Sequence, residues 1–252
     1  MRMGGLDAPH PGATASRLGR TSPRGGEAST SSPHPGATAS PLGRTSPRGG
    51  EASTAFVICG ALGSEVKEIV DRRGWAVDIH GVPALLHLYP GRIVDELREK
   101  LRALRPRYDH LIVVYGDCGT TGRLEPVLDE FGASRVRGPH CYEMFAGEEL
   151  FERVSDERPG TFFLTDWLVR NFGRAVIRGL GLDRHPELKE MLFGNYEALL
   201  YLRQVPNPRL AAKAEEIAVY LGLPLEINDV GLGQLESRLA ELVEPSSAAA
   251  PA

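Results

Sequence analysis

The sequence has no long apolar run, no excess of positive charge and only three cysteines among its 252 residues. A transmembrane helix needs about 18 or more consecutive apolar residues, and a secretory signal needs an apolar core of about 7–15 residues. Neither pattern is present. The net charge of −4 disfavours general nucleic-acid binding, because such proteins present a basic face to the phosphates. These absences predict a cytoplasmic protein that binds neither membranes nor nucleic acid.

The first 54 residues form a low-complexity tandem repeat. Residues 9–32 read PHPGATASRLGRTSPRGGEASTSS, and residues 33–54 read PHPGATASPLGRTSPRGGEAST. Proline, glycine, serine, threonine and arginine dominate, so the segment cannot bury enough apolar surface to offset the entropy of ordering it. We expect 1–54 to be a disordered tail, 55–244 to form an α/β domain, and the Ser/Ala/Pro-rich residues 245–252 to form a second disordered tail.

The remaining chain alternates between strand and helix patterns. The continuous apolar run at 110–115 is typical of a strand buried on both faces, and apolar residues at helical spacing predict an amphipathic helix over 91–104. The alternation predicts an α/β fold: a doubly wound, mostly parallel, Rossmann-like sheet with helices on both faces. The fold is expected as one domain or as two small lobes joined near 155–160. Other strands are expected at 56–59, 75–79, 134–137, 161–164, 198–205 and 224–228, and other helices at 64–72, 124–131, 143–154, 165–177, 186–195, 209–221 and 232–243.

Each cysteine comes at or soon after the end of a predicted strand. Cys59 ends the first strand, Cys118 lies three residues past the strongest strand, and Cys141 lies four residues past a short one. Ligands of open α/β sheets bind in the crevice beyond the carboxyl ends of the strands, so we expect all three thiols at one edge. The intervals between them, 58 and 22 residues, are too long for a zinc knuckle, so a shared site depends on the tertiary fold.

Three convergent thiolates suit a [4Fe–4S] cluster or zinc, with one coordination position left open. The first hypothesis is therefore a metal- or iron–sulfur-binding protein with Cys59, Cys118 and Cys141 as ligands. A metal-free module that binds a methyl donor, a corrinoid or an anion is one alternative. A thiol enzyme with Cys118 or Cys141 as nucleophile and a histidine base is another. Cysteine is also a common core residue, so a structural role stays open.

Three other side chains are candidate catalytic groups. His140 precedes a cysteine and can serve as a fourth ligand or proton carrier, or as an ordinary loop histidine. His87 follows the second strand at the same sheet edge and is a candidate base or ligand. Asp166 follows a predicted strand and faces the crevice or caps the next helix.

Two glycine-containing turns are candidate cofactor-binding segments. Residues 116–122 read GDCGTTG between a strand and a helix, so Gly119, Thr120 and Thr121 can offer donors to an anion. Gly60, after Cys59, allows close approach of a bound group. Neither turn matches the phosphate-binding P-loop or the dinucleotide fingerprint, so ATP and NAD are not predicted.

Short motifs in a fixed order suggest a family. With ICGAL, LHLYP, VYGDCG, GPHCYE and FLTD in this order, residues 55–230 resemble the bacterial and archaeal domain of unknown function 1638 family. The resemblance implies no established activity. It implies an association with corrinoid-dependent methyltransferase systems. That association implies an accessory or enzymatic role in one-carbon metabolism, with a small molecule or a corrinoid/methyltransferase system as partner. The tandem repeat has no counterpart in the family pattern.

Overall fold

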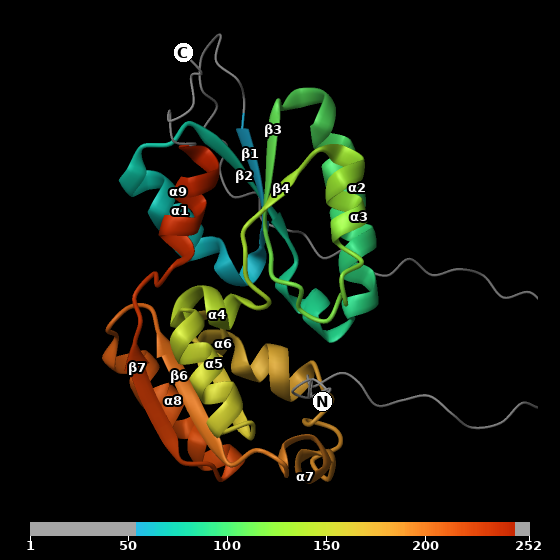
Figure 1. Cartoon of the computed structure of the whole chain (residues 1–252). Helices are drawn as coiled ribbons and strands as arrows, with labels where there is room; N and C mark the ends of the chain where they lie inside the picture. Colours follow the sequence, from blue (N-terminus) through green and yellow to red (C-terminus); the bar gives the residue numbers. More distant parts are fainter. Residues whose placement is uncertain (1–53, 245–252) are drawn as a thin grey trace, which may run out of the picture.

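The computed structural model describes residues 54–244. The predicted disordered tails, 1–54 and 245–252, lie outside the described residues except for Thr54, which is the first residue of a strand. The described chain folds into two parallel sheets, one of four strands and one of three (Figure 1). The predicted parallel α/β class is confirmed, in the two-lobed form.

The four-stranded sheet has the order β2-β1-β3-β4, and every pairing is parallel. Its strands are β1 (Thr54–Cys59), β2 (Val77–Val82), β3 (His110–Val114) and β4 (Ser134–Arg135). Because β2 lies on one side of β1 while β3 and β4 lie on the other, the winding direction reverses between β1 and β3. At such a switch point the two departing loops diverge and leave a crevice beyond the strand ends.

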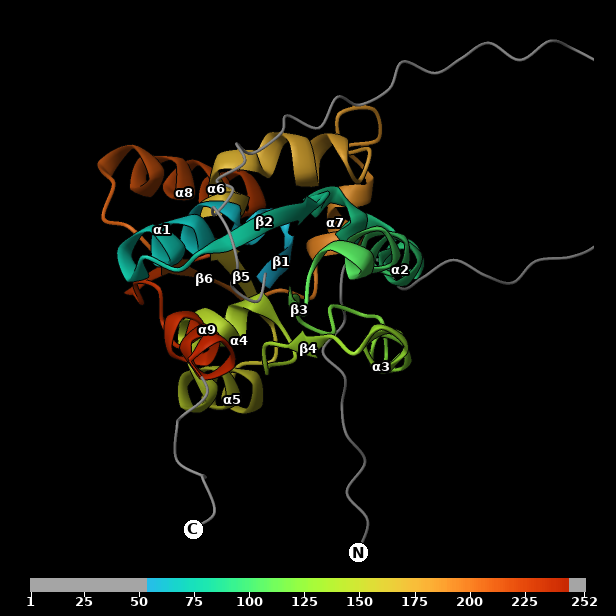
Figure 2. The same cartoon turned by 90° about the horizontal axis from the view of Figure 1, so that it is seen from above.

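Helices cover both faces of this sheet, because β1 and β3 are buried on both faces. Figures 1 and 2 place α1 and α9 on one side and α2 and α3 on the other. We call this assembly the first lobe. The helices are α1 (Gly63–Arg73), α2 (Ile93–Leu104), α3 (Glu125–Phe131) and α9 (Leu235–Val243), with short 3₁₀ turns η1 (Gly60–Leu62), η2 (Ala84–Leu88), η3 (Pro90–Arg92) and η4 (Arg105–Arg107).

The second lobe is built on the three-stranded sheet, β5-β6-β7, again parallel. Its strands are β5 (Thr161–Thr165), β6 (Ala198–Arg203) and β7 (Leu225–Asp229). Its helices are α4 (Cys141–Ala146), α5 (Glu148–Glu157), α6 (Asp166–Phe172), the π-helix η5 (Gly173–Arg178), α7 (Leu188–Phe193) and α8 (Pro208–Leu221).

The alternation of side chains along β6 joins the two lobes. Leu199 and Tyr201 pack into a core with α6 and α8, whereas Leu200 and Leu202 belong to the same buried cluster as the strands of the first lobe. Successive strand residues point to opposite faces, so one strand serves both cores. The two lobes therefore share a continuous apolar interior.

The chain also returns from the second lobe to the first through α9, which lies beside α1 (Figure 1). Arg73 Nε donates to Glu236 at 2.6 Å, and Trp75 Nε1 donates to Glu244 at 2.7 Å. A C-terminal helix that packs on the N-terminal lobe restrains the lobes from separating.

The structure departs from the sequence expectation most clearly at three elements. The predicted helix 143–154 is two helices, α4 and α5, because Gly147 takes a left-handed φ of 81°. The second strand begins and ends later than predicted, at Val77–Val82. The helix after β5 changes from α to π geometry at Gly173.

No helix within residues 54–244 has the length and apolar character that crossing a bilayer requires.

Candidate functional site

The switch point of the first sheet positions two of the cysteines. Cys59 is the last residue of β1, and Cys118 lies in the loop that leaves β3. The turn η1, directly after Cys59, contacts α6 of the second lobe, which directly follows β5. The carboxyl ends of β1 and β5 therefore meet at the junction of the lobes, where a crevice ligand of either sheet would lie.

A crossing of two loops brings the third cysteine to the same place. The amides of Asp117 and Cys118 both donate to the carbonyl of Pro139, at 2.8 and 3.3 Å. A Cβ on Gly116 would lie 2.8 Å from both the Cα of His140 and the carbonyl oxygen of Pro139. Only glycine lets the loops approach this closely, and their crossing places Cys141 beside Cys118.

The three thiols lie within electrostatic range of one another. Burial raises the pKa of Cys59 to about 11, although the amide of Ala61, 3.4 Å from its sulfur, and the Tyr115 hydroxyl act in the opposite direction. Burial and then the Cys59 thiol raise the pKa of Cys118 to about 12. Burial followed by the Cys118 and Cys59 thiols raises the pKa of Cys141 well above its usual value.

Cys118 also has a strained backbone. Its φ is 45°, in the left-handed region that residues other than glycine, asparagine and aspartate rarely adopt. Such a conformation costs about 1–3 kcal/mol and persists only where the surroundings impose it, which is common at functional sites. Here the Pro139 carbonyl and the Asp117 turn impose it.

Asp117 organises the GDCGTTG loop from within. Its carboxylate accepts the Thr120 hydroxyl at 2.6 Å and the amides of Gly122 and Thr121 at 3.0 and 3.1 Å. Burial favours a higher pKa for Asp117, but these hydrogen bonds outweigh it and lower its pKa. The donors proposed to hold an anion thus serve a carboxylate of the chain, and Gly119, with a φ of 82°, completes the turn beside Pro90.

Two tyrosines surround the thiols. The Tyr115 side chain is fully buried, and its hydroxyl interacts with the Cys59 thiol. That hydroxyl makes no hydrogen bond of normal geometry within the described chain. His87 stacks on the Tyr115 ring at 5.5 Å and 10°. Tyr142 lies within electrostatic range of all three cysteines, and its ring stacks on that of Phe163 in β5 with 5.3 Å between the ring centroids. The site therefore extends to the second lobe.

The two histidine candidates have different positions. His87 lies in η2, and its Nδ1 is 2.7 Å from the carbonyl oxygen of Ala84. Because a carbonyl only accepts, Nδ1 carries the proton, and in the neutral ring Nε2 carries the lone pair. His140 packs its ring 6.0 Å from Phe151 of α5. His87 reaches the cysteine site through its stacking contact with the Tyr115 ring. His140 is next to the site because it directly precedes Cys141 in the chain.

Gly60 has a packing role. A Cβ there would lie 3.0 Å from the carbonyl oxygen of Val82 and 3.3 Å from the amide of Ala84. Glycine therefore lets η1 pass close to the end of β2.

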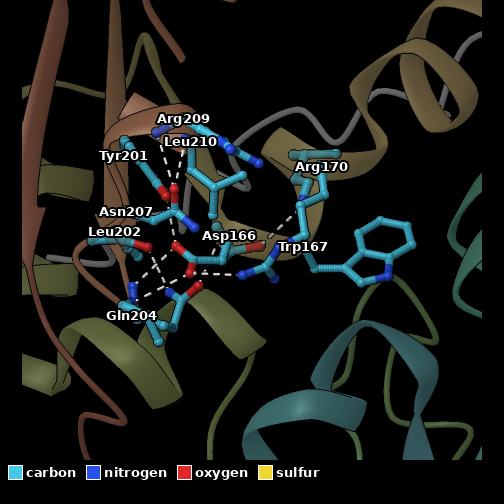
Figure 3. A network of polar contacts seen from close by, with 12 residues as sticks. Asp166, Trp167, Arg170, Tyr201, Leu202, Gln204, Asn207, Arg209 and Leu210 are labelled. Carbon is cyan, nitrogen blue, oxygen red and sulfur yellow. Dashed lines mark hydrogen bonds and ion pairs between the residues drawn. The ribbon is translucent and has the colours of Figure 1, made fainter. Parts of the chain in front are cut away.

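Asp166 is fully buried in a hydrogen-bond network of the second lobe (Figure 3). Its carboxylate accepts the Tyr201 hydroxyl at 2.6 Å, the Gln204 amide at 3.1 Å and the Arg170 guanidinium at 3.2 Å. Its own amide donates to the Gln204 side chain at 2.6 Å. The cap of α6 is Thr165, not Asp166. The network fixes the ends of β5 and β6 against α6.

Glu65 is a buried acid that sequence reasoning missed. It lies in the first turn of α1, is 5% exposed, and has one carboxylate oxygen without a hydrogen-bond partner in the described chain. Burial raises its pKa; its own amide and Arg170 lower it, and Asp166 raises it further. An acid in the first turn is normally an exposed partner of the helix dipole, so nothing in the local sequence signals this burial.

We predict that Glu65→Gln removes a destabilising pH dependence. A raised folded-state pKa contributes stability that is present below the unfolded value of about 4.5 and is lost as pH rises through the folded value. The variant should therefore gain stability over the wild type as pH rises from 4.5 to 7.5. Each tenfold difference in proton affinity between the folded and unfolded states would add about 1.4 kcal/mol to the gain. Urea unfolding at both pH values measures the gain. Glu99→Gln, an exposed change on α2, should show no such gain.

No group of three or more His, Cys, Asp or Glu side chains within residues 54–244 is arranged to hold a single metal ion. The thiols are near one another but are not a preformed mononuclear site. Sequence reasoning also missed Tyr115, because it ends an apolar run and the pattern predicts strand core there. The signal that could have found it was a hydroxyl-bearing side chain directly before a glycine-rich loop.

Comparison with known proteins identifies a family. The family model described as Protein of unknown function (DUF1638) matches residues 82–239. The matched segment contains Cys118 and Cys141, whereas Cys59 precedes it. No curated protein and no solved structure matches the chain. Because the family model covers more than half of the sequence, the chain belongs to this family of proteins of unknown function.

Proposed function

We propose that this protein binds an iron–sulfur cluster through Cys59, Cys118 and Cys141 at the junction of its two lobes. The observation that carries the proposal is the convergence of three thiols, two buried and one half-buried, at the switch point of a parallel sheet. They lie at the end of β1, in the loop after β3 and at the start of α4. This is the place where open α/β sheets bind ligands. A four-iron cluster with three cysteine ligands has one iron open to a small molecule, which supplies Lewis-acid or electron-transfer chemistry.

Zinc and a cluster place different demands on the three sulfurs. Tetrahedral zinc with Zn–S bonds of about 2.3 Å needs its sulfurs within about 4 Å of one another, whereas the ligands of a cluster bind different irons and are farther apart. Assays of metal and sulfide together therefore distinguish the two.

The chemistry of the surroundings also fits a cluster. The groups that act on the thiols include backbone amides at Ala61 and Leu62 for Cys59, and at Gly116 and Cys141 for Cys118. Amides that point at sulfur stabilise its thiolate form and tune a bound cluster. Raised pKa values, by contrast, do not favour a thiol nucleophile, which needs a lowered one.

The cellular setting belongs to the same proposal. A cluster with an open iron suits the reducing cytoplasm, where thiols stay reduced. A place in corrinoid-dependent one-carbon metabolism is the setting that the family resemblance suggests, and the cluster proposal does not depend on it.

We predict that the full-length chain, purified anaerobically or reconstituted with iron and sulfide, binds both in near-equal amounts and is brown. Cys59→Ser, Cys118→Ser and Cys141→Ser should each reduce bound iron and sulfide at least tenfold. Iron and acid-labile sulfide assays with an absorption spectrum measure this. Ser64→Ala, an exposed change near Cys59, is the control.

The outcomes of these assays distinguish the competing functions. Zinc without sulfide would replace the cluster by a mononuclear site. Retention of the cluster in Cys59→Ser would remove that residue from the ligand set, which matters because Cys59 precedes the family match. A wild-type chain that takes up no iron after reconstitution would leave the metal-free binding module as the better function.

A further inference from the structure

The Tyr115 hydroxyl is a buried polar group without a satisfactory partner among the described residues. The side chain is 0% exposed and directly follows β3, and its oxygen has no hydrogen bond of normal geometry within the described residues. Buried hydroxyls are nearly always bonded, and an unpaired one costs stability. A functional explanation is therefore required for a tyrosine where phenylalanine would fill the same space.

The nearest polar chemistry to this hydroxyl is the cysteine site. The hydroxyl interacts with the Cys59 thiol and also lies within electrostatic range of Cys118 and Cys141. A neutral thiol is a weak acceptor, whereas a metal-bound thiolate is a strong, charged one. The hydroxyl is therefore poorly paired in the metal-free protein and has a good partner when Cys59 binds iron.

The Tyr115 ring is held in one orientation. His87 stacks on it in near-parallel geometry, and the contact of His87 Nδ1 with the Ala84 carbonyl fixes that imidazole in turn. A preorganised donor does not need to reorient when the cluster gains charge.

We infer that Tyr115 donates a hydrogen bond to the Cys59 sulfur of the bound cluster and thereby raises its one-electron reduction potential. The inference rests on the proposed function. Hydrogen bonds to cluster sulfurs withdraw electron density and stabilise the more negative, reduced state. Tyr115 is thus a positioning residue that acts through Cys59, and the fourth iron stays open for a small molecule.

The test compares Tyr115→Phe with wild type in two states. In the reconstituted protein, the variant keeps its iron and sulfide content, and its midpoint potential shifts negative in a dithionite titration followed by absorption and electron paramagnetic resonance. In the metal-free protein, the variant has a melting temperature equal to or above that of wild type, because an unsatisfied group is removed. Tyr142→Phe, whose interaction with the thiols is electrostatic, is the matched control and retains the wild-type potential.

Equal potentials in Tyr115→Phe and wild type would overturn the inference and leave the cluster proposal intact. Absence of iron from the reconstituted wild type would overturn both. If Tyr115→Phe lowers iron content, tyrosine replacement by 3-fluorotyrosine in the wild type keeps the shape of the site and strengthens the donor. A positive shift of the potential then supports the hydrogen bond, and an unchanged potential refutes it.

Discussion

Arg238→Met is expected to lower the free energy of unfolding by about 3–5 kcal/mol, the usual cost of breaking a buried ion pair on one side. Arg238, on α9, donates to both carboxylate oxygens of Glu143, on α4, with Nη1 2.6 Å from Oε2. The side chains are only 10% and 5% exposed. Removal of the arginine leaves the Glu143 carboxylate buried without its partner.

The pair also supports the loop that carries Cys141. Arg238 Nη1 donates to the Arg137 carbonyl at 2.8 Å, and a Cβ on Gly138 would clash with Glu143 Oε2. The backbone of this loop is thus seated against the ion pair. Arg238→Met should therefore also lower cluster loading, although Arg238 is not a ligand.

A double-mutant cycle measures the pair. Glu143→Leu combined with Arg238→Met should recover most of the loss, because burying two apolar groups has no charge penalty. Urea unfolding of the full chain at pH 7 provides the four free energies. Glu130→Gln, which breaks the exposed pair with Arg98, is the control and should cost less than about 1 kcal/mol. Single losses below that value would show that Arg238 and Glu143 are not coupled as described.

The sequence predicts the fold well because the fold depends on local patterns. The apolar run at 110–115 contains β3, and the periodic residues from Ile93 to Leu104 form α2. The sequence carries a weaker signal for the division of the strands into two sheets. This division depends on which strands pair, and a parallel strand pairs with residues far along the chain, such as Thr54 with His110.

The candidate site was predictable only in part. The position of Cys59, Cys118 and Cys141 beyond strand ends follows from sequence, and the structure brings these thiols within mutual range. The partners of Asp166, the burial of Glu65 and the role of Asp117 as an internal cap could not be predicted. Each depends on a contact between segments or on a backbone angle, such as the φ of 45° at Cys118, that composition does not encode.

Gly116→Ala tests whether the loop crossing is what assembles the cysteines. The added methyl carbon would lie 2.8 Å from the Cα of His140 and from the Pro139 oxygen, which are backbone atoms that cannot rotate away. The loops must separate, and Asp117 and Cys118 then lose their hydrogen bonds to Pro139. We expect a stability loss of about 1–3 kcal/mol, as for overpacking elsewhere, and a larger loss of cluster uptake.

A loss of cluster uptake that exceeds the loss of stability would distinguish a defect at the cysteine site from general destabilisation of the fold. Gly91→Ala is the matched control, since a Cβ there meets nothing within 4 Å and Gly91 has no positive φ. Thiol proximity supplies a readout independent of iron: diamide should oxidise Cys118 and Cys141 to a disulfide more slowly in metal-free Gly116→Ala than in wild type. Equal oxidation rates would mean that the crossing at Gly116 does not set the distance between these sulfurs. A slower rate with reduced iron uptake would mean that the absence of a side chain at Gly116, which is not itself a ligand, determines whether the three thiolates can share a cluster.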